Sequence, residues 1–113
     1  MTENEEWKQI KGYEGLYSIS SFGRVRNVKR NIIRIPQINN WGYLYVMLSK
    51  NNVDKKFYLH RLVCEHFIDK TDYSQTYVDH INGVITDNKI SNLRWVNKSQ
   101  NSMNSKTPSN NTS

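Results

Sequence analysis

Residues 78–83 read V-D-H-I-N-G and residues 92–96 read N-L-R-W-V, and these two stretches decide the fold of the second half of the chain. Each stretch includes a short apolar run typical of a strand, and the connection between them is polar. Asn97 is a helix-capping residue with Gln100 three positions later, the capping-box arrangement that starts a helix. The segment therefore predicts strand, loop, strand and helix from residue 77 to about residue 106.

Four polar side chains come together if these elements pack, namely Asp79, His80, Asn92 and Asn101. A carboxylate and an amide oxygen are hard ligands that suit Mg²⁺ or Mn²⁺. Such an ion can neutralise both a phosphate oxygen and the leaving oxygen of a phosphodiester. A neutral imidazole can take the proton of an attacking water once a second group fixes its tautomer. Asn92 or a backbone carbonyl could be that second group.

Upstream, residues 7–27 form a glycine-punctuated meander rather than a helix. A strand at 16–19 and a turn at 21–23 should place Arg24 and Arg26 on one face of the next strand. Residues 43–48 should pair with 55–60 through a turn at Asn51-Asn52. After residue 60 the apolar period becomes helical, which predicts a helix over about 60–68.

Aromatic side chains should supply much of the core, because the chain has three Trp, seven Tyr and three Phe but only 36% hydrophobic residues. Trp7, Tyr13, Trp41 and Trp95 are expected to be core residues rather than base-stacking ones. Cys64 is the single cysteine, so it excludes an intrachain disulfide and a paired C-x-x-C zinc module. It should behave as a small buried hydrophobe.

The chain is basic, with a net charge of +6, and residues 21–56 hold eight Lys and Arg against Asp54 alone. This concentration favours a polyanion such as nucleic acid, but composition alone gives an ordinary solvated face equal weight. His60 and Arg61 could contact phosphate or make structural hydrogen bonds. The candidate DNA-binding residues are Arg24, Arg26, Lys29, Arg30, Arg34, His60, Arg61, Arg94 and Lys98.

The two stretches quoted first, with Asp87-Asn88 between them, resemble the HNH signature of phage and intron homing endonucleases. Residues 7–27 resemble the modular DNA-binding motif that precedes this nuclease, and L-H-R-L-V-C-E-H-F at 59–67 resembles its linking helix. The resemblance implies an α+β chain with an N-terminal motif over 1–58, a ββα-metal nuclease core over 59–106 and a disordered tail over 107–113.

Carried over by position, the resemblance makes His80 the general base, Asp79 and Asn101 the metal ligands, and Asn92 the residue that orients the imidazole. Many members have a histidine where this chain has Asn101. The ligand set is therefore oxygen only, which favours one Mg²⁺ or Mn²⁺ over tight zinc binding.

The expected function is hydrolysis of one strand of double-stranded DNA by a monomer, leaving a 5′-phosphate and a 3′-hydroxyl. The alternatives are a nucleic-acid-binding or nuclease-regulating protein with an inactive HNH core, and an RNA nuclease or a colicin-like nonspecific nuclease. No apolar run spans a membrane and the acidic start does not resemble a signal peptide, so the expected location is the cytoplasm of a phage-infected or intron-bearing host. The C-terminal tail resembles the lead-in to a DNA-recognition module, and limited sequence specificity is expected without one.

Overall fold

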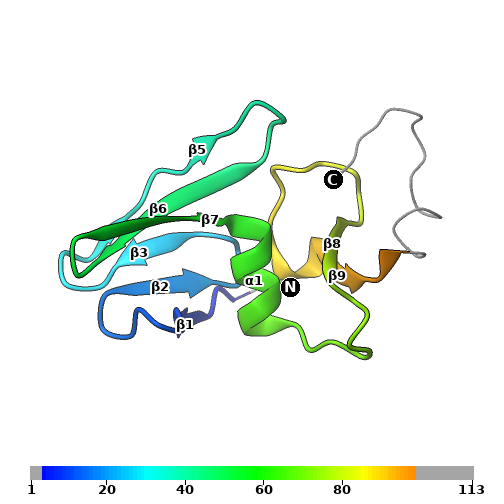
Figure 1. Ribbon diagram of the computed structural model, residues 1–113, viewed down its shortest axis with the longest axis horizontal. Coiled ribbons are helices and arrows are strands. Elements are labelled where there is room, and N and C mark those ends of the chain that lie inside the picture. The colour runs from blue at the N-terminus through cyan, green and yellow to red at the C-terminus, as the bar shows by residue number, and fades with distance from the viewer. Residues whose placement is uncertain (1–3, 99–113) are drawn as a thin grey trace.

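The computed structural model describes residues 4–98, which form three antiparallel sheets around one α-helix (Figure 1). The first sheet holds β1 (Trp7–Gln9), β2 (Tyr17–Ser20), β3 (Val25–Asn27) and β4 (Ile32–Ile33) in that order. The second holds β5 (Gln37–Ile38), β6 (Leu44–Lys50) and β7 (Val53–Tyr58), and the third pairs β8 (Tyr77–His80) with β9 (Leu93–Val96). Helix α1 spans Leu59–Phe67, and a short 3₁₀ helix at Ile90–Asn92 leads into β9. The expected α+β class with antiparallel strands and a linking helix is confirmed.

The first sheet is centred on β2, whose four residues are all buried between β1 and β3. A tight turn follows β2, in which the Gly23 amide donates to the Ser20 carbonyl at 3.0 Å. Gly23 has a φ of +86°, a left-handed value that favours glycine. The turn therefore returns the chain into β3 with Arg26 opposite Ser18.

The hairpin expected from the sequence is β6–β7, with Tyr45 opposite Tyr58 and Lys50 opposite Val53. Asn51 and Asn52 form its turn with φ values of 54° and 64°, the left-handed pair that a two-residue hairpin connection requires. The chain leaves β4 before Pro36 and enters β5 after it, because proline cannot donate to a strand ladder.

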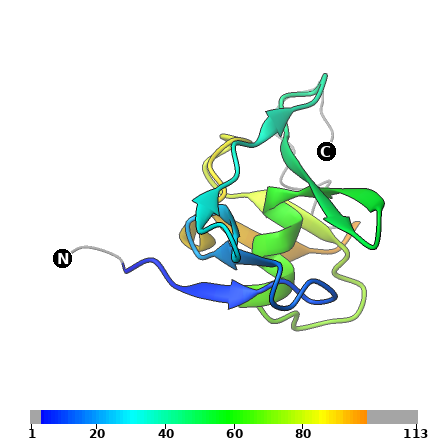
Figure 2. The same ribbon diagram turned by 90° about the vertical axis from the view of Figure 1, so that its left-hand side faces the viewer.

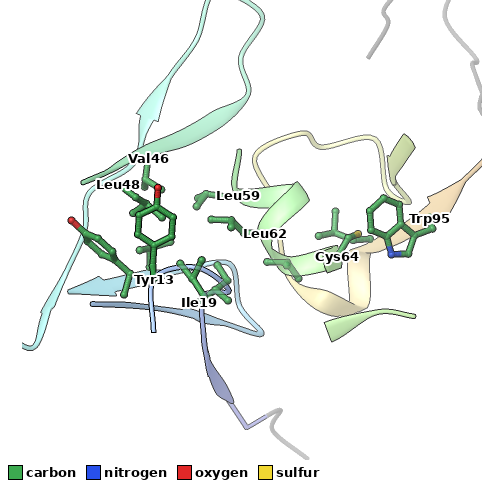
Figure 3. Close-up of a cluster of buried hydrophobic side chains, with 13 residues drawn as sticks. Tyr13, Ile19, Val46, Leu48, Leu59, Leu62, Cys64 and Trp95 are labelled. Atoms are coloured by element: carbon green, nitrogen blue, oxygen red, sulfur yellow. The ribbon is translucent and has the colours of Figure 1, made fainter. Parts of the chain in front are cut away.

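Helix α1 lies between the two larger sheets and the β8–β9 pair (Figures 1 and 2). It begins at Leu59 and ends at Phe67, each one residue earlier than expected, and its buried face includes Leu62, Val63 and Cys64. One hydrophobic core runs through the molecule, from Tyr13 and Ile19 past the helix to Trp95 on β9 (Figure 3). The sheets that precede the helix and the strand pair that follows it therefore share their buried surface.

The third sheet, β8 with β9, carries Asp79 and His80 of the predicted signature. In its antiparallel register Asp79 lies opposite Arg94 and His80 lies opposite Leu93. A loop of residues 81–89 connects the strands, as the sequence predicts, and it ends in the 3₁₀ helix, which the sequence does not predict. The helix expected after Asn97 falls almost wholly outside the described residues, which end at Lys98.

The prediction for the aromatic core is right for two residues and wrong for Trp41. Tyr13 and Trp95 are each 7% exposed, and Trp7 is half-buried. Trp41 is 80% exposed, because it lies in the turn between β5 and β6, where no element covers it. Among residues 4–98, no helix is long and apolar enough to cross a membrane.

Candidate active site

His80 ends strand β8 and is buried, with 8% of its surface exposed. Its Nε2 lies 2.8 Å from the Asn88 side-chain oxygen. Because that oxygen can only accept, Nε2 carries the proton and donates it to Asn88. In the neutral imidazole the lone pair is then on Nδ1. Asn88 thereby selects the tautomer in which Nδ1 is the basic atom.

Burial keeps His80 neutral near pH 7. Desolvation lowers the pKa of His80 below its ordinary value of 6.5. The hydrogen bond to Asn88 and the negative charges of Asp79 and Asp87 raise the pKa in part, since each stabilises the imidazolium. The balance leaves a neutral imidazole that can accept a proton, with anionic groups near enough to stabilise the charge it gains.

Asn92 has a different task from the one expected of it. Its side-chain oxygen accepts a hydrogen bond from the Asn82 amide at 2.9 Å, and its side-chain nitrogen donates to the Asp87 carbonyl at 2.9 Å. Both bonds close the loop between β8 and β9. The imidazole of His80 is bonded by Asn88 and not by Asn92, because the amide of Asn92 is committed to the loop backbone.

Asn88 is the site residue that sequence reasoning missed, although it lies within the quoted signature. It is 4% exposed, and its backbone packs directly on the Gly23 turn. A Cβ atom at Gly23 would lie 2.8 Å from the Asn88 carbonyl oxygen. The Ile90 amide donates to the Ser21 carbonyl at 2.8 Å in the same place. The turn between β2 and β3 therefore packs against the residue that bonds His80.

Asp79 lies next to His80 in the chain and is held by Arg94 from the facing strand. Arg94 Nε donates to Asp79 Oδ2 at 2.8 Å, and the Asp79 side chain is 20% exposed. Its carboxylate is a hard oxygen donor of the kind that Mg²⁺ or Mn²⁺ prefers, so the residue present fits such an ion. The second expected ligand, Asn101, lies outside the described residues. Among residues 4–98, no three His, Cys, Asp or Glu side chains gather in a metal-binding group.

Arg24, directly before β3, and Arg26, within it, lie against the same ring. Arg24 forms an ion pair with Glu5, and the guanidinium carbons of Arg24 and Arg26 lie 5.7 Å and 4.2 Å from the Trp7 ring centroid. Lys29 and Arg30 are exposed in the connection between β3 and β4.

Three other candidate DNA-binding residues make internal contacts. Arg34 donates to the Met47 carbonyl at 3.0 Å, and Arg61 donates to the Thr76 carbonyl at 2.7 Å. His60 is largely buried beside His80, with the two ring centroids 5.3 Å apart. Lys98 is exposed at the end of the described chain. The candidate DNA-binding residues thus divide into exposed side chains, such as Lys29, Arg30 and Lys98, and side chains that make contacts within the fold, such as Arg34, Arg61 and His60.

Comparison with known proteins identifies two motifs along the chain. A family model described as the NUMOD4 motif matches residues 5–49, and one described as an HNH endonuclease matches residues 57–103. The chain is 42% identical over 91 residues to DNA endonuclease I-HmuI of Bacillus phage SP01, an alignment covering 80% of this chain and 52% of that protein. It is also 38% identical over 103 residues to an uncharacterized HNH endonuclease of Acanthamoeba polyphaga mimivirus, covering 88% of this chain and 25% of the relative.

A solved structure described as DNA binding and cleavage by the HNH homing endonuclease I-HmuI matches with a TM-score of 0.79 and 41% identity. The match covers 88% of this chain and 56% of that one. The fold and site thus define an HNH nuclease domain preceded by a NUMOD4 motif. The chain resembles the homing endonuclease I-HmuI, of which it spans about half the length.

Proposed function

We propose that this chain is a metal-dependent endonuclease that hydrolyses one strand of double-stranded DNA, with His80 as the general base. The observation that carries the proposal is the buried His80 imidazole, whose Nε2 is committed to Asn88 so that Nδ1 is the basic nitrogen. Such a group suits the activation of water in front of a phosphodiester. The similarity to I-HmuI, a DNA endonuclease, supports the same reaction class.

In this reaction His80 Nδ1 takes the proton of the attacking water, and the Asn88 side chain keeps the ring in the productive tautomer. Asp79 and Asn101 would hold one Mg²⁺ or Mn²⁺ in a ββα-metal arrangement. When bound, such an ion supplies positive charge to the phosphate and to the departing 3′ oxygen. The products would be a 5′-phosphate and a 3′-hydroxyl, and one active site per monomer would give a nick.

The Asn92 side chain serves this chemistry indirectly. Its two hydrogen bonds fix both ends of the loop that carries Asn88. We therefore assign the orienting role to Asn88 and a loop-closing role to Asn92. The proposed ligand role of Asn101 stands on its position in the HNH signature.

The DNA would lie along the exposed cations. The exposed Arg24, Lys29 and Arg30 and the half-buried Arg26 offer positive charge beside the first sheet, and Lys55 and Lys56 of β7 add to it on the second. Lys56 Nζ lies over the Tyr45 ring at 4.5 Å from its centroid, a cation–π contact that places a positive charge beside an aromatic ring. Arg94 and Lys98 are exposed near the strand pair that carries His80. Contacts of this kind hold the phosphate backbone without reading its sequence.

A nicking assay on supercoiled plasmid tests the proposal. The wild-type chain with Mg²⁺ or Mn²⁺ should convert supercoiled plasmid to the open-circular form, and His80→Ala should not. DNA ligase should reseal the nick directly, because it requires a 5′-phosphate and a 3′-hydroxyl. If wild type and His80→Ala bind duplex DNA equally and neither nicks it, the chain is a binding protein with an inactive core. Cleavage of RNA in preference to DNA would identify an RNA nuclease.

The remaining assignments follow from the same proposal. Residues 1–58 would be the DNA-binding motif and residues 59–106 the nuclease core, followed by a tail at 107–113. The enzyme would act in the cytoplasm of an infected or intron-bearing host cell. Analytical ultracentrifugation with and without a short duplex tests whether it works as a monomer.

A further inference from the structure

His60 lies in the first turn of α1, outside the strand pair that carries His80, yet the two imidazoles are neighbours. Their ring centroids are 5.3 Å apart, with an angle of 58° between the planes. Tyr43 and Tyr58 flank His60 at centroid distances of 5.2 Å and 5.7 Å. The two tyrosine rings hold the His60 imidazole directly beside that of His80.

The two nitrogens of His60 have different surroundings. Among residues 4–98, the buried side-chain nitrogens with no hydrogen-bond partner are His60 Nδ1 and Asn88 Nδ2. His60 Nε2 is not one of these buried, unpartnered atoms, and the His60 residue as a whole has intermediate exposure. Any hydrogen bond from His60 to a substrate must therefore be made by Nε2.

The buried, unpaired Nδ1 indicates which nitrogen carries the proton. Leaving a donor N–H unpaired in the interior costs free energy, and an unpaired acceptor is the more common exception in proteins. The neutral ring therefore favours the tautomer with a lone pair on Nδ1 and a proton on Nε2. Burial lowers the pKa of His60 to about 3, helped by His80 once that ring is protonated at low pH and by the Arg61 guanidinium, so the His60 ring is uncharged at neutral pH.

A phenylalanine would fill the same space without a buried polar atom, so packing alone does not account for a histidine here. We propose that His60 is a further catalytic residue. Its neutral ring donates a hydrogen bond from Nε2–H to a non-bridging oxygen of the scissile phosphate, which is attacked by the water that His80 activates. The inference rests on the proposed function. An N–H aimed at that oxygen stabilises the charge that develops there, without placing a second cation beside the general base.

Nitrogen NMR of the histidine side chains tests the tautomer and the contact without needing activity. In the free protein His60 should show a protonated Nε2 and an unprotonated Nδ1. Adding a short DNA duplex without metal should shift the His60 Nε2 resonance. A protonated Nδ1, or a resonance that stays unchanged at saturating duplex, overturns the proposal whether or not the chain cleaves DNA.

Single-turnover cleavage tests the chemical role. His60→Phe keeps a ring among the tyrosines and removes the donor, and it should lower the rate about 10- to 100-fold while duplex affinity changes little. His60→Gln restores an N–H and should recover part of the rate. Thermal melting of each variant shows whether it folds, and His60→Leu, which also lacks the donor, takes the place of His60→Phe if that variant does not fold. A His60→Phe rate equal to that of wild type overturns the proposal in favour of a packing role.

A sulfur substitution at the scissile phosphate separates contact from indirect effects. Of the two phosphorothioate diastereomers, one replaces the oxygen that His60 would contact, and sulfur accepts hydrogen bonds weakly. With that isomer, His60→Phe should cost much less than with the natural phosphate. Equal losses on the phosphate and on both isomers overturn the contact. A wild-type chain that shows the NMR shift but never nicks DNA instead contradicts the proposed function.

Discussion

Arg94 lies opposite Asp79 in the β8–β9 ladder, and its Nε donates a 2.8 Å hydrogen bond to Asp79 Oδ2. The pair places a positive charge against the carboxylate that we assign to the divalent ion. Two cations at one carboxylate repel each other, so Arg94 should moderate the affinity for metal as well as hold Asp79 in place.

Arg94→Gln should therefore bind Mn²⁺ several-fold more tightly than wild type, because it removes the competing charge and keeps a side chain that can still donate. Isothermal calorimetry with the metal alone measures this directly. Asp79→Asn is the matched control and should bind Mn²⁺ more weakly. Weaker binding by Arg94→Gln would mean that orientation of Asp79 outweighs charge competition.

Alanine substitutions at Asn88 and Asn92 should affect different properties, the cleavage rate at Asn88 and the stability of the fold at Asn92. Asn88→Ala removes the hydrogen-bond partner of His80 Nε2 and should lower the cleavage rate about 10- to 100-fold. Asn92→Ala removes two bonds to the loop backbone and should lower the free energy of unfolding by about 1–3 kcal/mol. Urea unfolding and single-turnover cleavage of both variants separate the roles. Equal rate losses at equal stability would contradict the division.

Alanine should be tolerated less well at Gly23 than at Gly15, because only the Gly23 position lies against another part of the chain. Both have left-handed φ values, +86° and +80°, so alanine strains the backbone at each by about 1–2 kcal/mol. Only at Gly23 would the new Cβ meet Asn88, at 2.8 Å from its carbonyl oxygen. Gly23→Ala should therefore reduce cleavage well beyond Gly15→Ala. Similar activity in the two variants would show that the loop absorbs the contact.

His60 should make stability depend on pH. Its pKa is about 3 in the folded protein against about 6.5 when unfolded, so between these values the unfolded chain binds a proton that the folded chain does not. The free energy of unfolding should therefore fall as pH decreases from about 6.5 toward 3. Urea unfolding across this range should show a shallower decline for His60→Phe. Parallel declines for the two proteins would mean that His60 is not buried as a neutral ring.

Local signals in the sequence predict most of the elements. The Asn51-Asn52 turn identifies β6–β7 because two left-handed residues define that connection, and the change of period after residue 60 identifies α1. Trp41 was misjudged because hydrophobicity indicates burial only where another element covers the residue, and a hairpin tip has no cover.

The site was predicted less completely than the elements. His80 and Asp79 follow from the signature, and the structure places both at the end of β8. The choice between Asn88 and Asn92 depends on how a polar loop folds back on itself, which residue spacing does not specify. The roles of Asn101 and the helix around it stay predictions, since those residues lie beyond Lys98.

The contact between Gly23 and Asn88 has an evolutionary consequence. The two recognisable motifs are separated along the sequence by residues 50–56, which suggests that either could be exchanged by recombination. In three dimensions the turn at Gly23, in the first motif, packs against the loop of the second motif that carries Asn88. A chimera that joins this nuclease to a foreign N-terminal segment inherits a working site only if that segment brings a glycine to the same turn. The two motifs should therefore be inherited as a pair.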